Sequence, residues 1–334
     1  MTRCFVSMLV CCVLTQSGCA KPKHLTQTQQ VEMMAMLTNV NHAGLTYRAA
    51  VIRQMLQEAN WAAGRLNLPI KHPIQIEDVL DDYTGLPWFS VLQSTNQFPD
   101  TIFGTHIFDT SIPREERLRA LKIGISGRIN TTDFQFTFDR GRLRSITRMD
   151  DPETERYSRR LVELAGKPSL IDSNGAYQLA TQWLAAMDVD VPALEKQFGH
   201  SVNQLRYLPS GGTNAVLLPL YYVGLGTNNA PKWKPASYDP AVEVEILGTT
   251  KELQDLEIND PSFSHRPLLL ITNALDLIRT PNPSPKQLQN PATAQAYELT
   301  PAQVLNYTRN FELRHSKTNS VGDTNAPAIK SPHF

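Results

Sequence analysis

The chain has 334 residues, and its 32 lysines and arginines balance 32 aspartates and glutamates, so the formal charge at neutral pH is zero. A chain of this length can bury one large core or two smaller ones. The neutral balance does not favour nucleic acid as a partner, because nucleic-acid-binding proteins carry an excess of basic residues that neutralise phosphates.

Residues 1–19 are typical of a bacterial export signal. Arg3 supplies a positive charge, and an uncharged apolar run follows over residues 4–14. This run has the length of a signal-peptide core and is shorter than the roughly 20 residues that span a bilayer. The alternative is an N-terminal helix buried in the fold, but such a helix is usually apolar on one side only. We therefore expect an exported protein.

Two processing routes fit the end of this segment. Gly18 and Ala20 are the small residues that a general signal peptidase requires. Ser17-Gly18-Cys19 also resembles the end of a bacterial lipoprotein lipobox, whose cysteine is acylated, although Gln16 stands where an aliphatic residue is usual. Acylation of Cys19 would anchor the protein to the periplasmic face of a membrane. The first route would give a soluble periplasmic or secreted protein.

The distribution of cysteine favours the lipid anchor. All four cysteines lie within residues 1–19, and residues 20–334 contain none. A chain that otherwise excludes cysteine keeps one at the lipidation position. The mature body therefore has no disulfide, thiol nucleophile or cysteine-ligated metal.

Residues 20–43 form the predicted tether, as a short helix or a flexible spacer, and residues 44–165 form a first α+β module. Six apolar residues at helical spacing predict its first helix: Ile52, Met55, Leu56, Ala59, Ala63 and Leu66. The expected elements are, in chain order, a helix over 46–66, a turn over 81–88, a strand over 102–108, a short charged helix over 114–122, a strand over 123–129, and a hairpin of strands 134–138 and 143–148.

Residues 166–279 form a second α+β module. Asp172, Ser173 and Asn174 are good N-cap residues and predict the start of a helix that continues to about Met187. The elements expected after it are strands over 202–208, 215–223, 241–247 and 253–258, a turn over 209–212 between the first two, and a helix over 268–278.

Residues 280–334 have a different composition. Residues 280–285 hold three prolines and predict a semi-rigid linker without a fold of its own. Thr300 as N-cap and Pro301 in the first turn predict one short helix that ends near Phe311. The last twenty residues have the composition of a disordered tail.

The two modules look like copies of one unit. Trp61-Ala62-Ala63 followed by Leu68-Pro69 parallels Trp183-Leu184-Ala185-Ala186 followed by Val191-Pro192. The apolar residues of the two hairpins match at an offset of 110: Phe134, Phe136, Leu143 and Ile146 with Val244, Ile246, Leu253 and Leu256. Both return strands share an uneven three-residue spacing, which predicts a β-bulge at the same place. The alternative is a chance similarity between two α+β segments.

This pattern resembles the PepSY-like modules of exported bacterial proteins. The resemblance covers residues 124–150 and 174–258 and includes the hairpin sequence Gly141-Arg142-Leu143-Arg144-Ser145-Ile146. It implies two helix-plus-antiparallel-hairpin modules that bind or inhibit rather than catalyse. Residues 174–192 are also similar to an uncharacterised family of exported proteins from planctomycete- and verrucomicrobium-like bacteria, and that similarity implies no activity.

Sequence motifs for catalysis or metal binding are scarce. The eight histidines are scattered, and the chain lacks a Walker A motif, a Gly-x-Gly-x-x-Gly motif and a Gly-x-Ser-x-Gly motif. The adjacent acids Asp81-Asp82 and Asp150-Asp151 fit exposed turns better than a calcium loop, which alternates its oxygen donors. Four arginines within residues 140–148 fit a solvated hairpin better than a contact for acidic lipid or polymer.

One segment remains as a catalytic candidate, Ser262-Phe263-Ser264-His265-Arg266-Pro267. A serine beside a histidine in sequence does not point at it in space, so a capped helix start is the better interpretation. We therefore assign no catalytic, cofactor or metal residue. We expect a lipid-anchored, non-enzymatic protein that binds a protein, a peptide or an envelope component. An envelope hydrolase with its site between the modules and a purely structural envelope protein are the alternatives.

Overall fold

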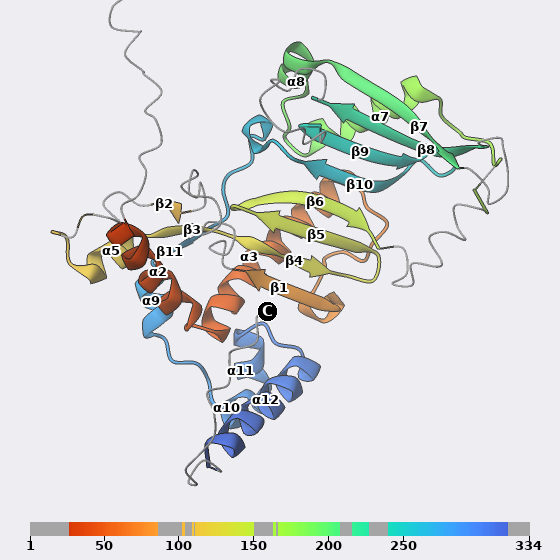
Figure 1. Cartoon of the computed structure of the whole chain (residues 1–334). Coiled ribbons are helices and arrows are strands. Elements are labelled where there is room, and N and C mark those ends of the chain that lie inside the picture. The colour runs from red at the N-terminus through yellow and green to blue at the C-terminus, as the bar shows by residue number, and fades with distance from the viewer. Residues whose placement is uncertain are drawn as a thin grey trace, which may run out of the picture.

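The structure is a computed structural model that describes residues 27–85, 102–103, 109, 111–149, 163–164, 166–207, 216–226 and 240–319. The predicted signal, Cys19, Asp150-Asp151 and the turn over residues 209–212 lie outside these ranges. An eight-stranded antiparallel sheet forms the centre of the fold, and a three-stranded antiparallel sheet lies beside it. Helices α3 (Leu45–Leu66) and α7 (Ser173–Ala186) lie on one face of the large sheet (Figure 1). This arrangement confirms the predicted α+β class.

The strands are β1 (Asp81–Gly85), β2 (Ile102–Phe103), β3 (Lys122–Gly124), β4 (Ser126–Asn130), β5 (Phe134–Asp139), β6 (Arg142–Arg148), β7 (His200–Tyr207), β8 (Val216–Leu225), β9 (Val242–Leu247), β10 (Glu252–Ile258) and β11 (Leu270–Thr272). The other helices are α2 (Gln27–Asn41), α5 (Arg114–Ala120), α8 (Val191–Phe198), α9 (Ala274–Arg279), α10 (Pro285–Leu288), α11 (Pro291–Ala296), α12 (Pro301–Asn319) and two short 3₁₀ turns, η1 (Ile76–Asp78) and η2 (Pro261–Phe263).

The first unit of the large sheet consists of α3 and strands β1, β4, β5 and β6. The expected turn over residues 81–88 is wrong for its described part, because residues 81–85 form β1 and pair with β4. Gly127 makes this pairing possible, since a Cβ atom at that position would collide with the carbonyl oxygen of Tyr83. The edge of the sheet at β1 therefore depends on a glycine in the neighbouring strand.

The expected strand over residues 123–129 is divided between the two sheets. Residues 122–124 form β3 in the small sheet, and residues 126–130 form β4 in the large one. Between them, the amide of Ile125 donates to the carbonyl oxygen of Leu269 at 3.0 Å. The expected helix over residues 268–278 is wrong in its first half, because residues 270–272 form β11, which pairs with β3. Only its end is helical, as α9.

The second unit consists of α7, α8 and strands β7 to β10. Asp172 caps α7 as predicted, and its side chain accepts a hydrogen bond from the amide of Gly175 at 2.8 Å. The four strands agree with their predicted positions to within about two residues. Helix α8 was not predicted, although Asp190 caps it in the same way through the amide of Ala193.

The two units join edge to edge between β6 and β10. In the strand order β1-β4-β5-β6-β10-β9-β8-β7, the β5–β6 hairpin and the β9–β10 hairpin lie next to each other in the middle of the sheet. Each hairpin has its register shift at the predicted bulge, between Leu143 and Ser145 in one and between Leu253 and Asp255 in the other. Both bulges are therefore confirmed.

The predicted alignment of the hairpins needs one correction. The return strands do match at an offset of 110, but Leu143 pairs with Phe138 whereas Leu253 pairs with Ile246. The outgoing strands consequently match at an offset of 108, and the counterpart of Phe136 is Val244. The reason is the loop, which comprises residues 140–141 in the first hairpin and residues 248–251 in the second.

One continuous core fills the space between the large sheet and its helices. Its largest fully buried side chains include Phe134, Phe136 and Phe138, which alternate along β5 toward the helices. The opposite face is mainly polar. A smaller apolar cluster lies apart from this core and consists of Leu164, Leu218, Leu220 and Leu247.

Both ends of the described chain pack on this body. Met36 and Val40 of α2 are buried in the core, so the described part of the expected tether is a packed helix. The expected linker leads directly into α10 and α11, which begin at the caps Ser284 and Asn290. Thr300 caps α12 as predicted, but this helix continues to Asn319. Within the described residues, none of the helices has the length and apolar character needed to cross a membrane.

Candidate functional site

The Ser-His segment does not form a catalytic arrangement. The hydroxyl of Ser262 donates to Asp260 at 2.6 Å, and Asp260 caps η2. The hydroxyl of Ser264 accepts from the backbone amide of Arg266 at 3.3 Å. His265 is exposed and lies 3.5 Å from Asp190. Each side chain therefore has its own partner, and the structure agrees with a capped start of a 3₁₀ turn.

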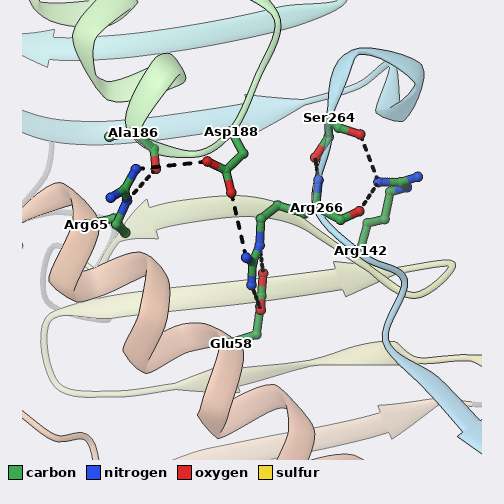
Figure 2. A network of polar contacts seen from close by, with 7 residues as sticks. All are labelled: Glu58, Arg65, Arg142, Ala186, Asp188, Ser264 and Arg266. Carbon is green, nitrogen blue, oxygen red and sulfur yellow. Dashed lines mark hydrogen bonds and ion pairs between the residues drawn. The ribbon is translucent and has the colours of Figure 1, made fainter.

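Arg266 of the same segment is the centre of a polar network between the two units (Figure 2). Its Nε and Nη2 atoms donate to the two carboxylate oxygens of Glu58 at 3.0 and 2.6 Å. Its Nη1 atom lies 3.6 Å from the carboxylate of Asp188. The guanidinium also stacks on Trp61, with its carbon 3.6 Å from the ring centroid. The hydrogen bonds to Glu58 raise the pKa of Arg266 above its usual value, so the group stays charged.

Helix α3 supplies the first unit's part of this network. Glu58, Trp61 and Arg65 are spaced at i, i+3 and i+7, which places them along one face of the helix. The side chain of Glu58 is only 8% exposed, so its charge is largely removed from water and needs the paired guanidinium. Arg65 donates to the carbonyl oxygen of Ala186 at 3.0 Å (Figure 2).

The second unit's part is fixed by its backbone. Asp188 has a positive φ of 57°, which turns the chain after α7. Val189 and Ser264 form an isolated antiparallel bridge, and the amide of His265 donates to the carbonyl oxygen of Asp188 at 2.9 Å. These bonds hold Asp188 and Arg266 next to each other, although they are 78 positions apart in the chain.

Arg142, at the start of β6, supports the same segment from the first unit. Its Nη1 atom donates to the carbonyl oxygens of Ser264 and Arg266 at 3.3 and 3.0 Å (Figure 2). Burial lowers the pKa of Arg142 from its usual value, and an arginine remains charged at neutral pH despite such a shift. Three arginines and one glutamate therefore connect the units through hydrogen bonds at their junction.

The space at this junction is small. A pocket beside Arg266 is lined by residues that include Glu58, Arg142, Met187 and Ile258, and its volume is about 10 Å³. That is about the space that one water molecule needs. Because the charged groups already bind one another, the network joins the two units.

A second polar feature lies on the face of the large sheet that α3 and α7 do not cover. Asp255 of β10 accepts a hydrogen bond from the hydroxyl of Thr147 at 2.6 Å. Burial, with a further contribution from Glu257 and Glu243, raises the pKa of Asp255 to about 6. Glu245 stands directly opposite Asp255 and Glu243 opposite Glu257, and like charges in that position repel each other.

The pKa of Asp255 has a consequence for stability. Because its pKa is higher in the folded chain than the usual value of 3.8, the folded state holds this proton more tightly than the unfolded state. The resulting stabilisation is complete below the unfolded pKa and is lost as the pH rises toward 6.

The remaining sequence candidates are engaged in structural contacts. Asp82 binds Arg48, and Asp81 lies 3.7 Å from Arg128. In the part of the chain that the structure describes, no group of three or more histidine, cysteine, aspartate or glutamate side chains is placed to hold a metal ion. The four arginines of residues 140–148 contact separate partners, which are Asp139, Ser264 and Arg266, Asn259, and Glu252.

The junction network was missed by the sequence interpretation. Glu58 and Arg266 are 208 positions apart, so no local motif joins them. One signal was available in the helical spacing. Glu58 lies three positions after Met55 and four before Ala62, which places it on the same buried face of α3 as these two residues. A charged residue on the buried face of a helix requires a partner. Comparison with protein-family models, curated proteins and solved structures finds no significant match to this chain.

Proposed function

We propose that the chain is an exported, non-enzymatic binding protein of the bacterial envelope, anchored through a lipid on Cys19. In this proposal the two units are PepSY-like modules that arose by duplication, and their common sheet binds an extended segment of another envelope protein. The predicted export signal over residues 1–19 supports the compartment. The matching strand orders and bulges support the duplication.

The observation that carries the binding role is the edge of the large sheet at β7, where no further strand of the described residues pairs. This strand has eight residues and is the outermost of the sheet. Residues 200–204 pair with β8 in regular register, and the register shifts only after Gln204. An edge strand of this kind presents unpaired backbone groups to which an incoming strand can add.

The opposite edge is protected in ways that β7 is not. Strand β1 has five residues, two of which are the acids Asp81 and Asp82. Short length and charged side chains are common devices against strand addition. In β7 the regular segment, residues 200–204, contains no proline, lysine, arginine or acid. A partner strand is therefore expected at β7 rather than at β1.

The junction network supports this proposal as well. An added strand gains most from a rigid template, because ordering a flexible one would cost conformational entropy. The bonds of Arg266 and Arg142 keep the two units in one continuous sheet. The described pocket beside these arginines is small and its lining includes no histidine, which gives no support to a hydrolase site at that place.

The test is a pull-down from envelope extract with the mature chain, residues 20–334, and two single-lysine variants. Asn203→Lys places a charge on the exposed edge strand. Gln135→Lys is the matched control, because Gln135 on β5 faces the same side of the sheet as Asn203. The two residues lie in one row of directly opposite residues across the strands, and the residues between them are Tyr222, Glu245, Asp255 and Thr147. The control position is about 24 Å from the edge, five strands away at about 4.8 Å each.

We expect Asn203→Lys to reduce capture of a partner on the order of tenfold, since a charge at an edge opposes strand pairing. Gln135→Lys should capture as the unmodified chain does. Equal loss in both variants would show binding to the sheet face, and undiminished capture in both would refute binding at β7.

A further inference from the structure

The three C-terminal helices form a small unit with its own apolar cluster. This unit comprises α10, α11 and α12, and we call it the C-terminal cap. Its cluster consists of Leu288, Ala294 and Leu299. Tyr297, Val304 and Tyr307 pack around it, and the N-terminal residue of α3, Leu45, is the member that the body contributes. Residues 280–284 connect α9 to the cap.

Arg48 of α3 is the main polar contact between the cap and the body. Its Nε and Nη2 atoms donate to the two carboxylate oxygens of Asp82 in β1 at 3.1 and 2.6 Å. Its Nη1 atom donates to the carbonyl oxygens of Glu298 and Tyr297 at 2.7 and 3.3 Å. Asp82 also accepts a hydrogen bond from Gln303 of α12 at 2.8 Å. One ion pair therefore joins α3, β1 and two parts of the cap.

Arg53, five positions further along α3, binds the same turn of the cap. It donates to the carboxylate of Glu298 at 3.1 Å and to the carbonyl oxygen of Ala296 at 3.5 Å. The carbonyls of Ala296 and Tyr297 belong to the end of α11, and the last carbonyl groups of a helix lack partners within it. They also carry partial negative charge, which suits a guanidinium. The body thus recognises the end of a helix through two arginines.

The cap covers the side chain of Asp82 in the edge strand β1. The side chains of Arg48 and Asp82 are only 14% and 7% exposed, and both contact the cap directly. In Figure 1 the cap lies next to β1, at the end of the sheet opposite β7. Contacts between separate structural units that are mainly polar usually allow relative motion.

We propose that the C-terminal cap is a releasable cover of the β1 edge, held by Arg48 and Arg53. Release removes Leu45 from the cap's cluster, leaves the core of the body intact, and uncovers Asp82 of the edge strand β1. The sheet then presents a second edge in addition to β7.

Hydrogen exchange of the mature chain tests this proposal. The rates of α10 to α12 are compared with those of β5 and β6 at about 0.01 M and about 1 M salt, which shortens the Debye length from about 30 Å to about 3 Å. We expect high salt to accelerate exchange in the cap only. Arg48→Gln should accelerate it on the order of tenfold, because the cap loses charged hydrogen bonds. Exchange in β5 and β6 should not change.

Two further variants keep the result interpretable. Arg53→Gln has little effect on folding because its side chain is 61% exposed, and it should still accelerate exchange in the cap. Arg128→Gln is the matched control, since Arg128 lies beside β1 and contacts Asp81. The proposal is overturned if the cap exchanges as slowly as β5 and β6 at both salt concentrations, or if Arg53→Gln leaves the cap unchanged.

Discussion

Substitution of Arg266 by methionine tests the account of the junction between the two units. Methionine keeps the length of the side-chain stem but removes both hydrogen bonds to Glu58. The carboxylate of Glu58, 8% exposed, then stays buried without its partner. Removing one member of a buried pair costs roughly 3–5 kcal/mol. Loss of the stacking on Trp61 adds about 0.5–2 kcal/mol.

A double variant separates the ion pair from the packing around it. Glu58→Met combined with Arg266→Met removes both charges and leaves two apolar side chains of similar volume. Such replacements are often neutral in free energy. We therefore expect the double variant to be more stable than Arg266→Met alone. Arg65→Met is the control, because Arg65 belongs to the same network but is 52% exposed, and its loss should cost less than about 1 kcal/mol.

Urea denaturation followed by circular dichroism gives the free energy of unfolding for each protein. The reasoning is refuted if Arg266→Met lies within about 1 kcal/mol of the unmodified chain. It is also refuted if the double variant is at least as destabilised as the two single variants together, because the pair would then have no favourable coupling.

Two further predictions concern the large sheet. Asp255→Asn should stabilise the chain at pH 7.5 by up to about 3 kcal/mol and remove part of the loss of stability between about pH 4 and 6. Asp81→Asn is the control, because Asp81 lies on the same face but is exposed, and it should do neither. Urea titrations at several pH values check this, and an unchanged pH profile of Asp255→Asn would contradict it. Gly127→Ala should lower stability by about 1–3 kcal/mol, because the added Cβ atom meets the carbonyl oxygen of Tyr83. Gly64→Ala should raise stability by about 0.5–1 kcal/mol, because Gly64 lies within α3 and has open space around it. Thermal denaturation of both variants tests this, and equal shifts of the melting temperature would be inconsistent with a tight β1–β4 contact.

Regular elements of the second unit could be predicted because their patterns are strong. The alternation of β9 and β10 and the cap of α7 at Asp172 are local signals, and both were found. Strand β1 was missed because Asp81, Asp82 and Gly85 are typical of turns, and only pairing with β4 makes them a strand. Strand β11 was missed because a short apolar run fits a helix and a strand equally well.

The small C-terminal helices carried signals that were not used. Pro285 belongs to the expected linker and Pro291 entered no prediction, yet proline is common in the first turn of a helix, and Ser284 and Asn290 are good caps. The contacts of Arg48 and Arg266 could not be predicted in any local way. The contacts of Arg48 with Glu298 and of Arg266 with Glu58 join residues more than 200 positions apart, and only the complete fold brings these together.

The proposed binding role depends most directly on β7. Hydrogen exchange of the mature chain, with and without a partner captured from envelope extract, measures which strand the partner covers. The account predicts slower exchange for residues 200–204 in the complex and unchanged exchange in β4 and β5. Unchanged exchange in β7, or protection confined to β4 and β5, would contradict it.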